Sequence, residues 1–334
     1  MEDKTKIPLT AAEISGLWAQ YINDTVATCV NRYFLEKVED EEVRPVIEWT
    51  LDTAKENLSI MEELFKKENY PIPIGFAEND VNLDAPKLVS DSFMLVYLRH
   101  MSIIAMTAGG SSLGIVTRPD LVSFFKRISE KGIMLQDLTR ELMLKQGTYV
   151  RPPSLSKPDK VEFVKDQGFL AGFFGDKRAL TAIEITQLFI NLESNAIGKA
   201  LITGFAQTAQ DEEVKQYFSR GKKLAEKNSD IFTQFLKKED LPTPMSWSSA
   251  ISNTTTNVFF DKLMMYHILT MASVSIGYYG TAMGTSQRRD LGLRYASMLP
   301  EVLLYAEDGA NIMIKHGWLE KPPQADNRDQ LINE

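Results

Sequence analysis

The chain repeats itself over almost its full length. Residues 9–18 return in closely similar form at 180–189, 171 residues later, and the Asp-Glu-Glu-Val run at 40–43 returns unchanged at 211–214. From residue 91 onward the shift is 170, so that the Pro-Pro pair at 152–153 returns at 322–323. Each copy is close to the common size of a domain and far longer than a solenoid module. The 334-residue chain is therefore predicted to hold two copies of one domain.

Composition and charge exclude several classes of protein. The formal net charge is −8, which argues against a nucleic-acid-binding protein because such proteins usually carry a basic face. The one cysteine, Cys29, excludes an internal disulfide and favours a reducing, cytoplasmic location, and its apolar neighbours favour a buried thiol. The first residues lack the apolar core of a signal peptide. The uncharged run at 263–287 contains a histidine and many small polar residues, so we expect a core helix and no membrane insertion.

The spacing of apolar residues predicts an all-α fold. Ile14, Leu17, Trp18 and Tyr21 lie three and four residues apart, as one face of a helix requires. Four such helices are expected in the first copy, and four in the second, near 181–209, 211–238, 259–286 and 288–316. Short connections join the first helix to the second and the third to the fourth. The prediction is two tandem up-down-up-down four-helix bundles, the first at 1–158 and the second, preceded by a linker segment, at 159–334.

Local signals refine this scheme. Thr10 with Glu13, and Thr181 with Glu184, are predicted to form capping boxes, and Asp40 is predicted to cap the second helix. The Gly-x-x-x-Gly pairs at 110–114 and 280–284 indicate close approach by a neighbouring helix, within the same bundle or between units or chains. Four phenylalanines in the linker, at 163, 169, 173 and 174, are expected to pack on a bundle.

A metal site in a bundle core is a weaker prediction. Di-iron bundles use Glu-x-x-His pairs, and none of the three histidines has a glutamate three residues before it. In the second copy, however, the topology places Glu184, Asn228, His267 and Asp308 at one level. Glu184, His267 and Asp308 are therefore candidate ligands for a metal ion such as iron. Ordinary hydrogen bonds of His267 and Asp308 are the alternative, and otherwise no cofactor is expected.

Several segments also carry a resemblance to a known family. They include 71–76 (Pro-Ile-Pro-Ile-Gly-Phe), 151–153 (Arg-Pro-Pro), 308–314 (Asp-Gly-Ala-Asn-Ile-Met-Ile) and 317–320 (Gly-Trp-Leu-Glu). With them the chain resembles a family of unknown function from spore-forming bacteria, built of tandem ferritin-like bundles, some members of which are labelled "putative spore coat protein". The resemblance implies a ferritin-like fold and no established activity. That family often has a histidine on the second helix, where this chain has Asn57 and Asn228.

The sequence shows no catalytic constellation, such as a nucleophile motif with a base. We therefore expect an uncharacterised, non-enzymatic structural or interaction protein, with spore-coat or sporulation association implied by the resemblance. Its expected partners are further copies of itself or coat proteins. The alternative is a metal- or small-ligand-binding bundle with its site in the second copy, because His267 and Asp308 are replaced by Tyr97 and Leu138 in the first.

Overall fold

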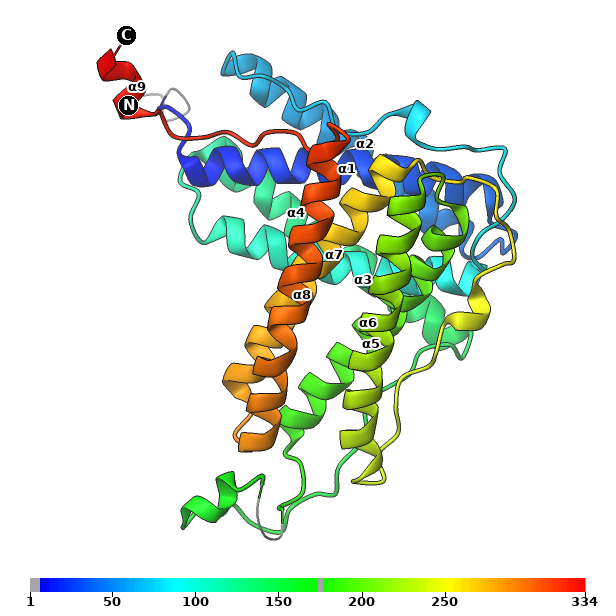
Figure 1. Cartoon of the computed structure of the whole chain (residues 1–334), viewed down its shortest axis with the longest axis vertical. Coiled ribbons are helices and arrows are strands. Elements are labelled where there is room, and N and C mark those ends of the chain that lie inside the picture. Colours follow the sequence, from blue (N-terminus) through cyan, green and yellow to red (C-terminus); the bar gives the residue numbers. More distant parts are fainter. Residues whose placement is uncertain (1–6, 174–176, 334) are drawn as a thin grey trace. The chain divides into compact units, whose positions relative to one another are not determined.

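A computed structural model describes residues 7–173 and 177–333. The described part is helical and contains no strand, apart from one isolated bridge between Val89 and Ile251. Figure 1 shows the helices in chain order. Eight long helices, three short 3₁₀ turns and a short terminal helix are present among the described residues: α1 (Ala11–Lys37), α2 (Arg44–Lys67), η2 (Glu78–Asp80), α3 (Asp91–Leu113), α4 (Pro119–Lys145), η3 (Gln167–Leu170), α5 (Ala182–Thr208), α6 (Glu212–Lys237), η4 (Ser248–Ala250), α7 (Asp261–Thr285), α8 (Arg289–Lys315) and α9 (Arg328–Asn333).

The chain divides into two compact units that are interleaved in the sequence. Unit 1 comprises Met1–Val81, Leu98–Arg140 and Gly317–Glu334, and unit 2 comprises Asn82–Tyr97 and Glu141–His316. Within unit 2, α5 packs on α6 and α7, and α8 packs on the same two helices. The units are defined by packing within the chain, so the sequence-based domain limits of 1–158 and 159–334 stay a prediction.

The starts of α1 and α5 confirm the predicted capping boxes. The Thr10 hydroxyl accepts from the Glu13 N–H at 3.3 Å, and the Glu13 carboxylate accepts from the Thr10 N–H at 2.8 Å. In the second copy the two matching distances, for Thr181 and Glu184, are 3.3 and 2.9 Å. Each box pairs two backbone donors that the first helical turn would otherwise leave without a partner.

The start of α2 differs from the prediction. Asp40 accepts from the Glu42 N–H at 2.8 Å in a turn, and α2 begins only at Arg44 with no side-chain cap. Pro45 explains the delay, because a proline fits only the first turn of a helix. The second copy has no proline there, and Asp211 caps α6 at 2.7 and 3.2 Å as expected.

Two further expectations differ from the structure. A Cβ on Gly110, Gly280 or Gly284 would meet no atom within 4 Å, so no described helix of this chain approaches them closely, and approach by another copy of the chain stays a prediction. In the linker, Phe163 and Phe173 are 88% and 53% exposed and do not pack on a bundle. Residue 174 lies outside the described residues. The remaining linker phenylalanine, Phe169, is half-buried beneath the Arg178 guanidinium, at 4.1 Å from its ring centroid.

Unit 1 brings together two of the segments that carry the family resemblance. The Glu320 carboxylate accepts from the backbone N–H groups of Ile74 at 3.0 Å and Gly75 at 2.5 Å. Gly75 has φ +61°, and a Cβ there would also overlap the Thr25 side chain, so glycine is required. The next N–H, of Phe76, donates to the Thr25 hydroxyl at 3.1 Å. Glu320 and Thr25 therefore both bind backbone N–H groups of the 71–76 loop.

One described helix is long and apolar enough to cross a membrane by length and composition. It is α3, and 56% of its most apolar window is buried in the structure. A buried core helix passes the same test, so the evidence for membrane insertion is weak. The uncharged run singled out in the sequence forms α7.

Candidate functional site

In each copy, Glu13 or Glu184 belongs to a cluster of buried ion pairs, called a node below, where the first and fourth helices of the copy begin. In unit 1, Arg118 is fully buried and pairs with Asp120 at 2.7 Å and Glu68 at 2.8 Å. The Glu13 carboxylate accepts from the backbone N–H groups of Thr117 and Arg118, both at 3.1 Å. This carboxylate therefore joins the start of α1 to the start of α4.

Unit 2 repeats the node with one addition. Arg288 pairs with Asp290 at 2.9 Å and Glu239 at 3.4 Å, and its backbone N–H donates to Glu184 at 2.9 Å. Arg178 also donates two hydrogen bonds, of 2.7 and 2.8 Å, to the Glu184 carboxylate. The corresponding residue of the first copy is Ile7. Burial opposes the ionisation of Glu184, but the hydrogen bonds from Arg178, Thr181 and Arg288 outweigh it and lower its pKa to about 2.

The other two candidate ligands lie in different surroundings. The buried His267 ring has its Nε2 3.3 Å from the Tyr97 hydroxyl and contacts the edge of Phe205. The Asp308 side chain is 47% exposed and pairs with Arg220 at 2.7 Å. Glu184, His267 and Asp308 thus have separate partners, and a metal shared by the three stays a prediction that none of these contacts supports.

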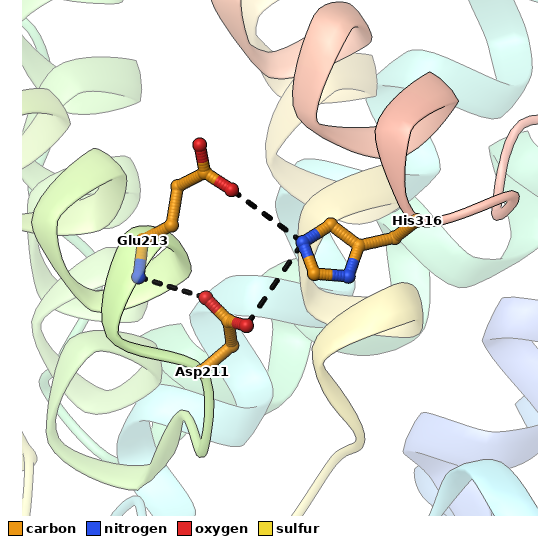
Figure 2. A group of neighbouring side chains, drawn as sticks. All are labelled: Asp211, Glu213 and His316. Atoms are coloured by element: carbon orange, nitrogen blue, oxygen red, sulfur yellow. Dashed lines mark hydrogen bonds and ion pairs between the residues drawn. The ribbon is translucent and has the colours of Figure 1, made fainter.

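A different group of potential ligands comes together at the ends of α6 and α8. Among the described residues, Asp211, Glu213 and His316 are the acidic and histidine side chains whose ligand atoms all lie within 4.8 Å of one another. Figure 2 shows His316 Nε2 facing both carboxylates, at 3.5 Å from Glu213 Oε2 and 3.9 Å from Asp211 Oδ2. One imidazole and two carboxylates suit a divalent transition metal.

Local folding explains why these three side chains converge. Asp211 is the N-cap of α6, Glu213 lies in the first turn of that helix, and His316 is the C-cap of α8. Helices α6 and α8 pack together, and the start of α6 lies beside the end of α8. The hydrogen bond from Lys315 Nζ to Glu213, 2.9 Å long, lowers the pKa of this carboxyl, and a metal would compete with Lys315 for it.

Sequence reasoning missed this group because the expected up-down-up-down order is wrong. That order places the end of the fourth helix level with the end of the second, whereas His316 at the end of α8 lies beside Asp211 at the start of α6. The start of α8 lies instead beside the start of α5, where the Arg288 N–H donates to Glu184. The repeat also keeps the acidic pair as Asp40 and Glu42 but has Gln146 in place of His316.

A surface depression of about 490 Å³ adjoins this group along α6 and α8. Two ion pairs line it: Arg220 with Asp308, and Lys315 with Glu213. Tyr217 also lines the depression, and its ring stacks on that of Tyr305 with the centroids 4.2 Å apart. The balanced charges of these pairs give the depression no preference for an anion or a cation.

The comparisons with known proteins give a family but no activity. The sequence model described as "Protein of unknown function (DUF3231)" matches residues 1–161 and residues 168–331. The chain belongs to the DUF3231 family. The family model is repeated across the chain, in agreement with the two copies seen in the sequence.

Other comparisons add little to this membership. No curated protein matches the chain. A crystal structure from Bacillus halodurans C-125, described as a "putative spore coat protein", is 16% identical with a TM-score of 0.41 and covers 46% of this chain and 99% of its own. The ferritin-like character of this DUF3231 protein stays a prediction.

Proposed function

We propose that this DUF3231 protein is a non-enzymatic structural or interaction protein built from two tandem four-helix bundles, and that it assembles with further copies of itself. The buried ionisable groups at both nodes support a structural role, because Arg118 and Arg288 each bind two carboxylates and hold helix ends together. Coat proteins in a sporulating cell are the other partners to test, on the strength of the family resemblance.

The observation that carries self-assembly is an exposed apolar face on α8. Leu293, Leu303, Leu304 and Ile314 are 60, 53, 60 and 62% exposed. Leu293 and Leu304 are eleven residues apart, as are Leu303 and Ile314, so each pair lies on nearly one line of the helix. Isolated exposed leucines are ordinary, but several on one helix face are typical of an interaction surface. The first copy has part of the same exposed apolar face on α4. Ile133 and Met134, which correspond to Leu303 and Leu304, are 51 and 48% exposed.

Sedimentation velocity over a range of concentrations tests this proposal. The native chain is expected to gain mass as its concentration rises, and the double variant Leu303→Glu/Leu304→Glu is expected to remain monomeric. Ile183→Glu is the matched control, because Ile183 is 55% exposed on α5 and lies outside the α8 face. A native chain that stays monomeric, or a double variant that assembles as the native chain does, would overturn the proposal.

A second candidate function is divalent-metal binding at Asp211, Glu213 and His316, and the convergence of their ligand atoms favours it. Calorimetric titration with Zn²⁺ or Fe²⁺ tests it. His316→Gln, which introduces the residue of the first copy, is expected to weaken binding by about tenfold or more. Glu212→Gln is the control, because Glu212 is an exposed acid of the same turn outside the group. Equal affinities of the native and His316→Gln proteins would contradict a metal site here.

A further inference from the structure

A cavity of about 80 Å³, partly open to solvent, lies among the four long helices of unit 2. Its walls are mostly apolar and come from all four helices, with Ile202 on α5, Leu224 on α6, Met271 on α7 and Val302 on α8. No charged side chain lines it, since the polar lining residues are serines, asparagines and tyrosines. A charged molecule would lose its hydration there without gaining a counterion, so the cavity suits a neutral one.

The polar end of the cavity is a hydrogen-bonded trio of Asn195, Asn228 and Tyr279. Asn195 Nδ2 donates to the Asn191 carbonyl at 2.7 Å and lies 3.0 Å from the Tyr279 hydroxyl as a second acceptor, and that hydroxyl in turn can donate to Asn195 Oδ1 at 3.2 Å. Asn228 Nδ2 then donates to the Tyr279 hydroxyl at 3.1 Å. The Tyr279 hydroxyl thus both donates and accepts hydrogen bonds within the trio. Asn228 donates to it through Nδ2, which leaves Asn228 Oδ1 as the remaining acceptor.

Two buried polar atoms around this cavity have no hydrogen-bond partner among the described residues. They are Asn228 Oδ1 and the Tyr305 hydroxyl, on side chains only 2% and 6% exposed, and both residues line the cavity. Leaving such atoms unpaired costs free energy, and native proteins rarely do so. The carbonyl oxygen of Asn228 needs a donor, and the Tyr305 hydroxyl can serve a donor or an acceptor.

From these observations we infer that the cavity binds a small neutral molecule with a short apolar body and one hydroxyl group, of the short-chain alcohol class. The hydroxyl donates to Asn228 Oδ1 and the Tyr305 hydroxyl donates to it, while the apolar body contacts Ile202, Met271 and Val302. The size is appropriate, because 80 Å³ is about half of the 150 Å³ engineered cavity that holds a benzene ring.

The repeat shows that this site belongs to the second copy alone. Asn195 and Asn228 correspond to Asp24 and Asn57, so the polar centre is present in both copies. Tyr279 and Tyr305, however, correspond to Gly109 and Leu135, which supply no hydroxyl. In the first copy, the amide of Gln20 donates to Asp24 at 3.0 Å.

Methyl-resolved NMR of the full chain, titrated with 1-propanol, tests the inference. The methyl signals of Ile202, Ile268 and Val302 are expected to shift and saturate, and propylammonium is expected to leave them unchanged. Gly198→Val should abolish the shifts, because a Cβ on Gly198 enters the cavity wall with only Met271 nearby, at 3.7 Å. Gly277→Val is the matched control, since Gly277 is also helical but a Cβ there meets no atom within 4 Å.

A second variant keeps the test informative if Gly198→Val fails to fold. Tyr305→Phe removes a hydroxyl that finds no hydrogen-bond partner among the described residues, so it should fold normally and weaken 1-propanol binding several-fold. Unsaturable shifts in the native protein would mean that water alone serves these atoms and would overturn the inference. So would equal binding by the native, Gly198→Val and Tyr305→Phe proteins. None of these results depends on the state of assembly, so the inference and the proposed self-assembly fail separately.

Discussion

Tyr217 and Tyr305 stack face to face between α6 and α8, with ring centroids 4.2 Å apart and planes inclined by 4°. Each ring ends against a glycine of the opposite helix: a Cβ on Gly221 would overlap the Tyr305 hydroxyl, and a Cβ on Gly309 would overlap that of Tyr217. Each tyrosine thus lies four residues before a glycine of its own helix, and the two helices interlock reciprocally. The Tyr217 hydroxyl also donates to the Tyr305 carbonyl at 3.1 Å.

This interlock predicts that Gly309→Ala destabilises the protein. Alanine is normally better than glycine in a helix by about 1 kcal/mol. Here the added methyl group must displace the Tyr217 ring, and overpacking of this kind costs about 1–3 kcal/mol. Denaturant unfolding followed by circular dichroism measures the change. Gly277→Ala, where the methyl group has free space, is expected to stabilise, and a stabilising Gly309→Ala would contradict the interlock.

The ion-pair nodes predict a loss of stability in acid. The pKa of Glu13 and that of Glu184 are lowered from 4.5 to about 2, because hydrogen bonds to the carboxylates outweigh the effect of burial. Their contribution is therefore fully present above about pH 5 and is lost as the pH falls through 2. Glu184→Gln should reduce stability at pH 7 and flatten the acid limb of a stability-versus-pH curve. An unchanged acid limb in this variant would show that the carboxylate is not a stabilising ion.

Asp24 predicts the opposite dependence in unit 1. Burial raises its pKa from 3.8 to about 7, and the hydrogen bonds from Gln20 and Asn57 only partly oppose this. Stability from the neutral form is present below pH 4 and is lost as the pH rises through 7, by roughly 2–4 kcal/mol in total. Asp24→Asn, the residue of the second copy, should remove this loss when melting temperatures at pH 5 and pH 8 are compared. The exposed Asp52→Asn is the control, and an identical pH response in both variants would refute the prediction.

Much of the fold followed from the sequence because its signals are local. Helical periodicity and the Thr10–Glu13 and Thr181–Glu184 boxes depend on neighbours within one or two turns. The exceptions arose where a second element decides. Pro45 delays α2. The close-packing glycines include Gly221 and Gly309, which face tyrosines of another helix, while Gly110 and Gly280 face open space.

The candidate sites were less predictable for the same reason. Glu184 was correctly placed as a cap, but its pairing with Arg178 and Arg288 depends on how the linker and the start of α8 approach α5. The group around His316 joins side chains about a hundred residues apart. The cavity beside Asn228 depends on the sizes of side chains from four helices, which no spacing within one segment reports.

The buried thiol in unit 1 offers a direct probe of opening. Cys29 is 3% exposed, its Sγ donates to the Ala77 carbonyl at 3.3 Å, and burial raises its pKa to about 12. Because the thiolate is the reactive form, a thiol reagent at pH 7–8 should react only through opening of unit 1. The labelling rate is expected to rise with denaturant in parallel with the loss of helix. The variant Cys29→Ala/Ser123→Cys, with its thiol on the exposed side of α4, should react at once. Equal rates for the two proteins without denaturant would show that the Cys29 site is open to solvent.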